Sequence, residues 1–129
     1  FVLEYEGIEA LSGFIVINFK KTPQHNQFHE LIFKQLNPLR EGHVRDISKH
    51  THYTDKQIKN EKEYGHHNVF SLYQPHITLI RFKDPDDAAR LAPKVVWEIP
   101  QFEVSKLAVY EMGEHGTCRK LVKEFQFGL

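Results

Sequence analysis

The chain opens with two stretches whose hydrophobic patterns differ. FVLEYEG (1–7) alternates apolar and polar residues and stops at Gly7, which predicts a half-buried strand. GFIVINFKK (13–21) is almost continuously apolar and rich in β-branched residues, which is typical of a more central strand. We therefore expect an outer and a central strand at the start of the fold.

A helix begins directly after the second of these strands. Thr22 provides an N-cap, and Pro23 takes the first helical position. Asn37-Pro38 ends the helical pattern. Apolar residues recur at helical spacing between these limits, at Phe28, Leu31, Ile32 and Leu36. The pattern predicts a strand–helix unit.

Residues 38–72 are polar, mixed in charge and rich in histidine. Thr54 and Gln57 form a capping-box pattern, and a helical stretch then runs to Gly65. Because this stretch has few apolar residues, we expect a short, solvated helix within a long excursion from the domain. Such insertions in compact domains are often functional or disordered.

The rest of the chain returns to strand and helix patterns. HITLIRF (76–82) predicts a strand, and Asp84 caps a helix that begins at Pro85. Two further strands are expected in FEVSKLAVYEM (102–112) and KLVKEFQFGL (120–129), on either side of the turn EHGT. This order predicts an α+β fold in which helices pack on one face of largely antiparallel sheets.

Length and composition narrow the class of protein. A chain of 129 residues suits a single domain, 1–129, with a substantial core. Its 17 basic and 17 acidic residues cancel, so we expect no extended nucleic-acid-binding face, although a small phosphate ligand or a nucleic-acid end needs only local charge. Cys118 is the single cysteine, no run is long and apolar enough for a membrane span, and no signal peptide is recognisable. We therefore expect a cytoplasmic protein without a membrane partner.

The stretch YQPHITLIRF (73–82) carries the candidate chemistry. Alternation along a strand places His76, Thr78 and Ile80 on one face, with the first two about 7 Å apart. A histidine exchanges protons near neutral pH, and a threonine hydroxyl can bind a phosphate oxygen. By itself, such a pair is more often a solvent-facing or hydrogen-bonded pair than a catalytic one. Regular alternation places Arg81 on the opposite face, so it could reach His76 only through a bulge or from the strand end.

This stretch resembles the second signature of the two-histidine (2H) phosphoesterase superfamily, which includes 2'-5' RNA ligase-like proteins and cyclic phosphodiesterases. That signature is a histidine, a hydrophobic residue, a threonine or serine and another hydrophobic residue, often preceded by proline and followed by arginine. The residues that match it in order are Pro75, His76, Ile77, Thr78, Leu79 and Arg81. Residues 1–21 with the following helix, and residues 102–129, also resemble the surroundings of this signature in that superfamily.

The resemblance implies a two-lobed fold with a His-x-Thr motif in each half and no cofactor or metal. The substrates would be 2',3'-cyclic phosphates or 2'-5' linkages of nucleotides or RNA ends. His76 would then be one of two general acid/base histidines, and Thr78 would hold the phosphate oxygens. Arg81 and Tyr73 would bind the substrate, the latter by stacking on a base.

The first His-x-Thr motif is expected upstream of Phe1, so the fold would be incomplete at its N-terminus. His52-Tyr53-Thr54 has the right letters, but its flanks are polar, and Thr54 is better explained as the N-cap of the next helix. The excursion 38–72 is not typical of the superfamily and could reshape or cover the cleft.

Other histidines allow alternatives. His25 and His29 lie four residues apart on a predicted helix, a spacing that a metal could use, but a solvated helix flank is the better interpretation. A second cluster lies in the excursion: His43, His50, His52, His66 and His67. This cluster could make the chain a metal-binding module. The missing first His-x-Thr motif allows another alternative, a noncatalytic nucleotide- or protein-binding domain derived from the same fold. Its oligomeric state does not follow from the sequence.

Overall fold

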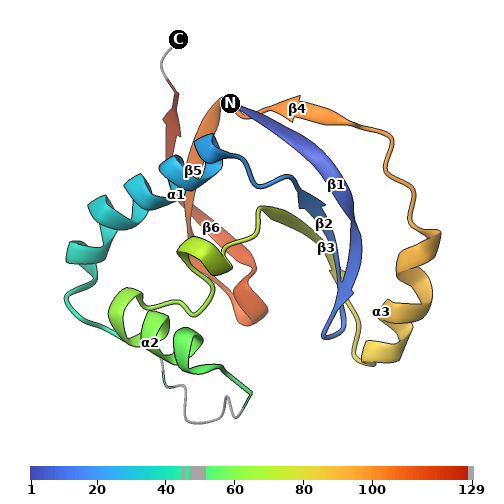
Figure 1. Cartoon of the computed structure of the whole chain (residues 1–129), viewed down its shortest axis with the longest axis horizontal. Coiled ribbons are helices and arrows are strands. Elements are labelled where there is room, and N and C mark those ends of the chain that lie inside the picture. Colours follow the sequence, from blue (N-terminus) through green and yellow to red (C-terminus); the bar gives the residue numbers. More distant parts are fainter. Residues whose placement is uncertain (45, 47–51, 128–129) are drawn as a thin grey trace.

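The computed structural model describes residues 1–44, 46 and 52–127 (Figure 1). The strands are β1 (Val2–Leu11), β2 (Phe14–Phe19), β3 (His76–Arg81), β4 (Gln101–Glu103), β5 (Lys106–Met112) and β6 (Cys118–Gln126). The α-helices of the described part are α1 (Pro23–Leu36), α2 (Asp55–Tyr64) and α3 (Pro85–Leu91). Its short 3₁₀ turns are η1 (Asn37–Arg40), η2 (Phe70–Leu72), η3 (Ala92–Lys94) and η4 (Glu114–Gly116). The predicted α+β class is confirmed.

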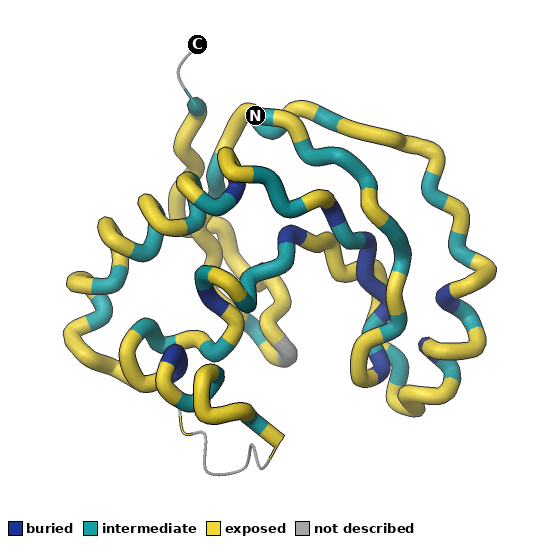
Figure 2. The backbone as a smooth tube through the Cα atoms, viewed as in Figure 1, coloured by how far each residue is buried: buried dark blue, intermediate teal, exposed yellow. Residues whose placement is uncertain are grey.

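Four strands form one antiparallel sheet in the order β3-β2-β1-β4, and β5 and β6 form a separate two-stranded sheet. The most deeply buried strand is β2, in which Ile15, Val16, Ile17 and Phe19 are all buried (Figure 2). A continuous apolar run needs cover on both faces, so the prediction of a central strand here is confirmed. The edge strand β3, in contrast, is exposed along its whole length.

Two strand predictions were wrong at their ends. Strand β1 does not stop at Gly7, because the pairing with β2 shifts between Tyr5 and Gly7 and then continues to Leu11. The predicted strand 102–112 is two strands, since β4 pairs with β1 whereas β5 pairs with β6. Alternation is the same in both sheets, so the sequence pattern does not reveal where the chain passes from one to the other.

The helices lie on both sides of the larger sheet and not on one face, as the sequence had led us to expect (Figure 1). Ala88 of α3 and Ala92 of η3 pack against Ile15 of β2, and these small side chains allow the helix to approach the sheet closely. The opposite side of the sheet faces α1, with which it shares a cavity described below. The helix α3 packs on β1 and β2, and the β3 residues Ile77 and Leu79 are exposed.

Local capping signals placed the helix starts correctly. Thr22 caps α1 by accepting a hydrogen bond from the backbone N–H of His25, and Asp84 caps α3 in the same way. The interpretation of His25 as part of a solvated flank was wrong. The His25 ring is buried, with its centroid 5.2 Å from that of Phe1, and its Nδ1 lies 2.9 Å from the Lys20 carbonyl oxygen.

The helix α2 begins at the capping box of Thr54 as predicted, but it is not simply solvated. Asn60 and Glu61 are buried, although both are polar. The Asn60 side chain donates to the His67 carbonyl oxygen over 3.0 Å, and a Glu61 carboxylate oxygen lies 3.4 Å from His67 Nδ1. Buried polar groups require such partners, so this side of α2 is held against the segment that leads to β3.

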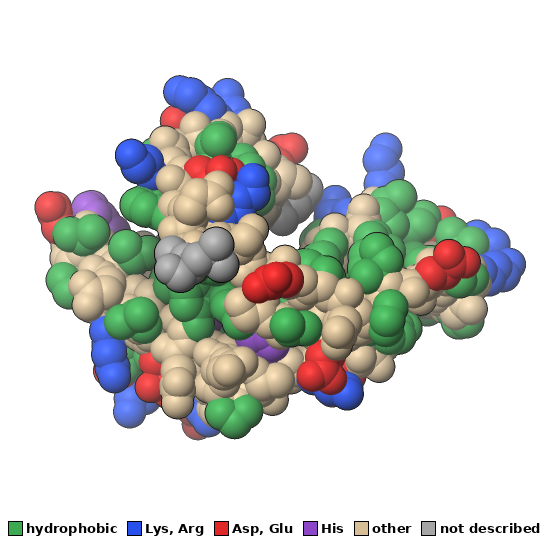
Figure 3. All heavy atoms as spheres, turned by 90° about the horizontal axis from the view of Figure 1, so that it is seen from above, with side chains coloured by type: hydrophobic (Ala, Val, Ile, Leu, Met, Phe, Trp, Pro, Cys, Tyr) green, Lys and Arg blue, Asp and Glu red, His purple; other side chains and the backbone are tan. Residues whose placement is uncertain are grey.

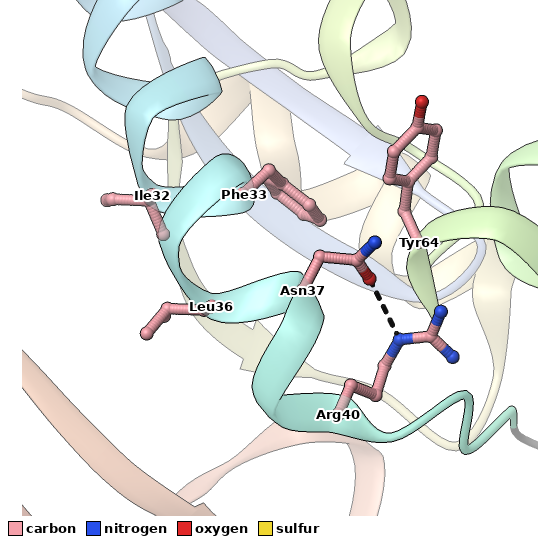
Figure 4. A pocket seen from close by; sticks show the side chains of 6 residues that line it. All are labelled: Ile32, Phe33, Leu36, Asn37, Arg40 and Tyr64. Atoms are coloured by element: carbon pink, nitrogen blue, oxygen red, sulfur yellow. Dashed lines mark hydrogen bonds between the residues drawn. The ribbon is translucent and has the colours of Figure 1, made fainter.

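A small cleft of about 150 Å³ separates α1 from α2, and Figure 4 shows its lining. The Arg40 guanidinium spans it by donating to Asn37 Oδ1 over 3.0 Å and to the Glu63 carbonyl oxygen over 2.8 Å. Gly65 ends α2 with φ +74°, and a Cβ there would lie 2.7 Å from Arg40 Cδ. We call these contacts of Arg40 the Arg40 clamp. A side chain at position 65 would collide with Arg40, and the bond to the Glu63 carbonyl oxygen holds the end of α2 in place.

Candidate functional site

The pairing of β3 with β2 contains an irregularity that changes which side chains share a face. The paired residues are Asn18 with His76, Ile17 with Ile77, Val16 with Thr78, Ile15 with Ile80, and Phe14 with Arg81. Leu79 is therefore an extra residue without a partner on β2, as in a β-bulge.

The bulge brings Arg81 to the same face as His76 and Thr78. Directly paired residues of antiparallel strands share a face, and Phe14, which pairs with Arg81, shares a face with Val16, the partner of Thr78. The Arg81 guanidinium lies 5.7 Å from the centre of the Phe14 ring, which agrees with this placement. Regular alternation had put Arg81 on the other face and Ile80 with His76; the bulge reverses both. We call the face with His76, Thr78 and Arg81 the His76 face.

His76 is exposed, and its ring is oriented by the chain just before it. Its Nδ1 lies 2.8 Å from the Gln74 carbonyl oxygen. A carbonyl can only accept, so Nδ1 carries the proton and the lone pair of the neutral ring is on Nε2. The Gln74 side chain in turn donates to the Phe19 carbonyl oxygen over 2.9 Å and to Glu6 over 3.0 Å. The orientation of His76 is thus tied to the end of β2.

Two cavities lie along the His76 face, and the space-filling view shows the molecule hollowed between two lobes (Figure 3). The first, the His76 cavity, has a volume of about 500 Å³. Its lining consists of Glu9, Leu11, Asn18, His29, Phe33, His66, Asn68, Leu72, Tyr73, Gln74 and His76. The second, the Arg81 cavity of about 580 Å³, lies between Thr78 and Arg81 and the turn 116–118 of the β5–β6 hairpin.

The four predicted site residues thus all line one or the other of these two cavities. Tyr73 and His76 line the first, and Thr78 and Arg81 line the second. All except Tyr73 belong to β3, so the strand itself connects the two cavities.

Tyr73 stacks on His29, with ring centroids 4.0 Å apart and an interplanar angle of 14°. The Phe70 backbone N–H donates to His29 Nε2 over 2.9 Å. Burial, followed by the positive charge of Lys21, lowers the pKa of His29, and burial raises the pKa of Tyr73. His29 is therefore held neutral with its Nε2 lone pair occupied, so it is poorly suited to be the proton acceptor of a reaction.

Sequence reasoning missed several residues of the His76 cavity. His29 was assigned to a solvated helix flank, which was wrong because its partners Phe70 and Tyr73 arrive from about 40 residues further along the chain. Asn18 and Glu9 were not singled out. Asn18 is the one strongly polar side chain of β2, FIVINF, and this exception in an apolar strand was a usable signal.

The His52-x-Thr54 pattern does not form a second half of the site. Thr54 Oγ1 accepts from the Gln57 backbone N–H, and the Gln57 side chain accepts from the Thr54 backbone N–H. The interpretation of Thr54 as an N-cap is confirmed. Neither His52 nor Thr54 lines the His76 cavity.

The sequence contains two histidine groups that a metal could use, His25 with His29 and the histidines of the excursion. Within residues 1–44, 46 and 52–127, no group of three or more His, Cys, Asp or Glu side chains is arranged to hold a metal ion. Of the histidines of the excursion, His66 lines the His76 cavity, whereas His50 lies outside the described residues.

Comparisons with known proteins do not assign this arrangement to a family: no family model matches the chain, and neither a curated protein nor a solved structure matches it significantly. None of the helices that the structure describes has the length and hydrophobicity needed to cross a membrane. The function proposed below is therefore based on the residues of the His76 face.

Proposed function

We propose that this protein is a metal-independent phosphodiesterase of the two-histidine type, acting on 2',3'-cyclic phosphates or 2'-5' linkages of nucleotides or RNA. The observation that carries the proposal is the common face of His76, Thr78 and Arg81, which depends on the bulge at Leu79. These are three of the residues in which the sequence resembles the second signature of that superfamily. The single cysteine, Cys118, is compatible with a cytoplasmic setting.

The chemistry follows from the side chains. His76 Nε2 would take a proton from the attacking water or hydroxyl, or give one to the leaving oxygen, and such a transfer typically contributes about 10²–10⁴ in rate. The Thr78 hydroxyl would donate to a phosphate oxygen, and Arg81 would stabilise the negative charge that develops in the transition state. Tyr73 would contact the base next to the phosphate.

The second proton-transfer group is part of the proposal. The resemblance implies a second His-x-Thr motif, which we propose lies in a segment preceding Phe1. His29 is unsuited because its Nε2 accepts from Phe70, and Thr54 of the other His-x-Thr pattern caps a helix. His66 lines the same cavity as His76 and is the histidine of this chain to test beside it.

A noncatalytic role is the alternative. It is favoured by the finding that the His-x-Thr pattern at His52 serves helix α2 and does not line the His76 cavity. In that case the cavities would bind a nucleotide phosphate ester without turning it over.

Hydrolysis of 2',3'-cyclic nucleotides and of a 2'-5'-linked dinucleotide in EDTA tests the proposal. The 129-residue chain and a form that also carries the proposed segment preceding Phe1 should be compared, each with His76→Ala, His66→Ala and, as a matched control, His43→Ala. His43 is exposed and does not line the cavity. We expect turnover in the longer form, lost in His76→Ala and retained in His43→Ala. Binding without turnover in both forms would favour the alternative, and equal turnover by His76→Ala would refute the assignment of His76.

A further inference from the structure

A polar pair lies across the sheet from His76 and shares its cavity. Asn18 is the direct partner of His76 on β2, and Glu9 lies on the next strand, β1, on the same face. The Asn18 side-chain amide donates to Glu9 Oε2 over 3.0 Å. Glu9 pairs with Val16, two residues along β2 from Asn18. The backbone at Glu9 is therefore two strand spacings, about 9–10 Å, across the sheet from β3, and two residues, about 7 Å, along the strand direction from His76.

This pair presents hydrogen-bond acceptors toward the cavity. One N–H of the Asn18 amide is used on Glu9 Oε2, which leaves Glu9 Oε1 and Asn18 Oδ1 as acceptors and the second amide N–H as a donor. Within the described part of the chain, neither atom accepts a hydrogen bond. Glu9 is exposed and Asn18 is half-buried, so a ligand in the cavity can reach both.

The rest of the cavity suits a nucleobase. Its volume of about 500 Å³ lies within the range of about 300–1,000 Å³ that is usual for small-molecule sites. Leu11, Leu72, Phe33 and Tyr73 supply apolar and aromatic surface, on which a base can stack. Among the described residues of the lining, Glu9 is the only carboxylate. It lies two strands across the sheet from Thr78 and Arg81 of β3, so it is separated from these two residues, which are assigned to the phosphate.

We propose that the His76 cavity binds a guanine base, with the Glu9 carboxylate accepting from guanine N1–H and from its 2-amino group while Asn18 holds the carboxylate in place. Guanine presents two adjacent donors on its Watson–Crick edge. Adenine and cytosine each present one amino group beside a ring acceptor, and uracil presents one N–H between two carbonyl oxygens that a carboxylate would repel. The inference rests on the proposed function and deepens it, because it makes guanosine-containing phosphate esters the preferred substrates.

Base preference is tested by binding, separately from turnover. In the His76→Ala protein, which cannot use this histidine for catalysis, affinities are measured by calorimetry for the 3'-monophosphates of guanosine, inosine, adenosine, cytidine and uridine. Inosine lacks only the 2-amino group. We expect guanosine to bind about tenfold more tightly than adenosine, cytidine or uridine, the discrimination that one bidentate pair typically provides, with inosine in between.

Substitution of Glu9 identifies the group responsible. Glu9→Gln should remove the preference for guanosine, because an amide offers one acceptor and one donor in place of two acceptors. Glu4→Gln is the matched control on the same strand: Glu4 pairs with Lys20 and does not line the cavity. Equal affinity for all five nucleotides, no binding of any, or a guanosine preference that survives in Glu9→Gln would overturn the inference. Hydrolysis of all four common 2',3'-cyclic nucleotides at equal rates by the wild type would likewise overturn it while leaving the phosphodiesterase proposal intact.

Discussion

His29 illustrates how a neighbouring segment determines the state of a single side chain. Its ring lies between α1 and the chain that enters β3, where it stacks on Tyr73 and accepts from the Phe70 N–H. Burial there disfavours the charged ring, which is why the pKa of His29 is lowered. The residue therefore joins α1 to the β3 approach only as long as it stays neutral.

A pH dependence of stability follows. Because the pKa of His29 is lower in the folded protein than its ordinary value of 6.5, the unfolded chain takes up this proton first as the pH falls. The contribution of the neutral His29 ring to stability is complete above pH 6.5, the ordinary pKa. It is lost as the pH falls from there through the lower pKa of the folded protein. Between about pH 7.5 and about pH 5.5, the free energy of unfolding should therefore fall more steeply in the wild type than in His29→Gln. Denaturant titrations at each pH measure this, with His43→Gln as control. Identical slopes for wild type and His29→Gln would contradict it.

At the scale of elements, what the sequence could predict depended on how local the determining contacts are. The starts of α1, α2 and α3 were predicted correctly because Thr22, Thr54 and Asp84 cap residues within three positions of themselves. The burial of His25 and Glu61 was not predicted, because their partners come from other segments. The sequence suggested a bulge only as one way in which Arg81 could reach His76. Nothing in HITLIRF indicates that Leu79 has no partner on β2.

The clamp at the end of α2 gives a prediction with a close internal control. Gly65 and Gly42 have nearly the same φ, +74° and +75°, but only at Gly65 would an added Cβ meet Arg40. Alanine at either position should cost about 1–2 kcal/mol for the left-handed backbone. Gly65→Ala should cost about 0.5–1.5 kcal/mol more for each Arg40 hydrogen bond that is displaced. Equilibrium unfolding compares the two variants. An equal loss of unfolding free energy in both would show that alanine at position 65 displaces no Arg40 hydrogen bond.

The cap of α2 is tested separately. Thr54→Ala should reduce the free energy of unfolding by about 0.5–2 kcal/mol, because the Gln57 backbone N–H loses its acceptor. Thr54→Ser keeps the hydroxyl and should remain close to the wild type. If Thr54→Ser is as unstable as Thr54→Ala, the methyl group rather than the cap matters at this position.

At the scale of the whole molecule, the candidate site draws on elements from most of the chain. The His76 cavity joins β1, β2 and β3 to α1 and to the segment after α2, and the Arg81 cavity adds the β5–β6 turn. The sequence predicted Tyr73, His76, Thr78 and Arg81 from one continuous stretch. It did not predict Glu9, Asn18 or the role of His29, because these meet His76 only through strand pairing and helix packing. The excursion 38–72 supplies one side of the first cavity, through His66, Asn68 and Leu72.

The most direct test of the account asks whether Thr78 and Arg81 act together on one phosphate, as their common face predicts. The measurement is a double-mutant cycle on kcat/KM for a 2',3'-cyclic nucleotide, with Thr78→Ala, Arg81→Ala and the double variant. Each single change should cost up to about 10²–10³, as the loss of one transition-state donor does, and the double variant should lose clearly less than the product of the two. Losses that multiply independently, or wild-type kinetics in Arg81→Ala, would contradict the claim that the bulge at Leu79 unites these residues in one active site.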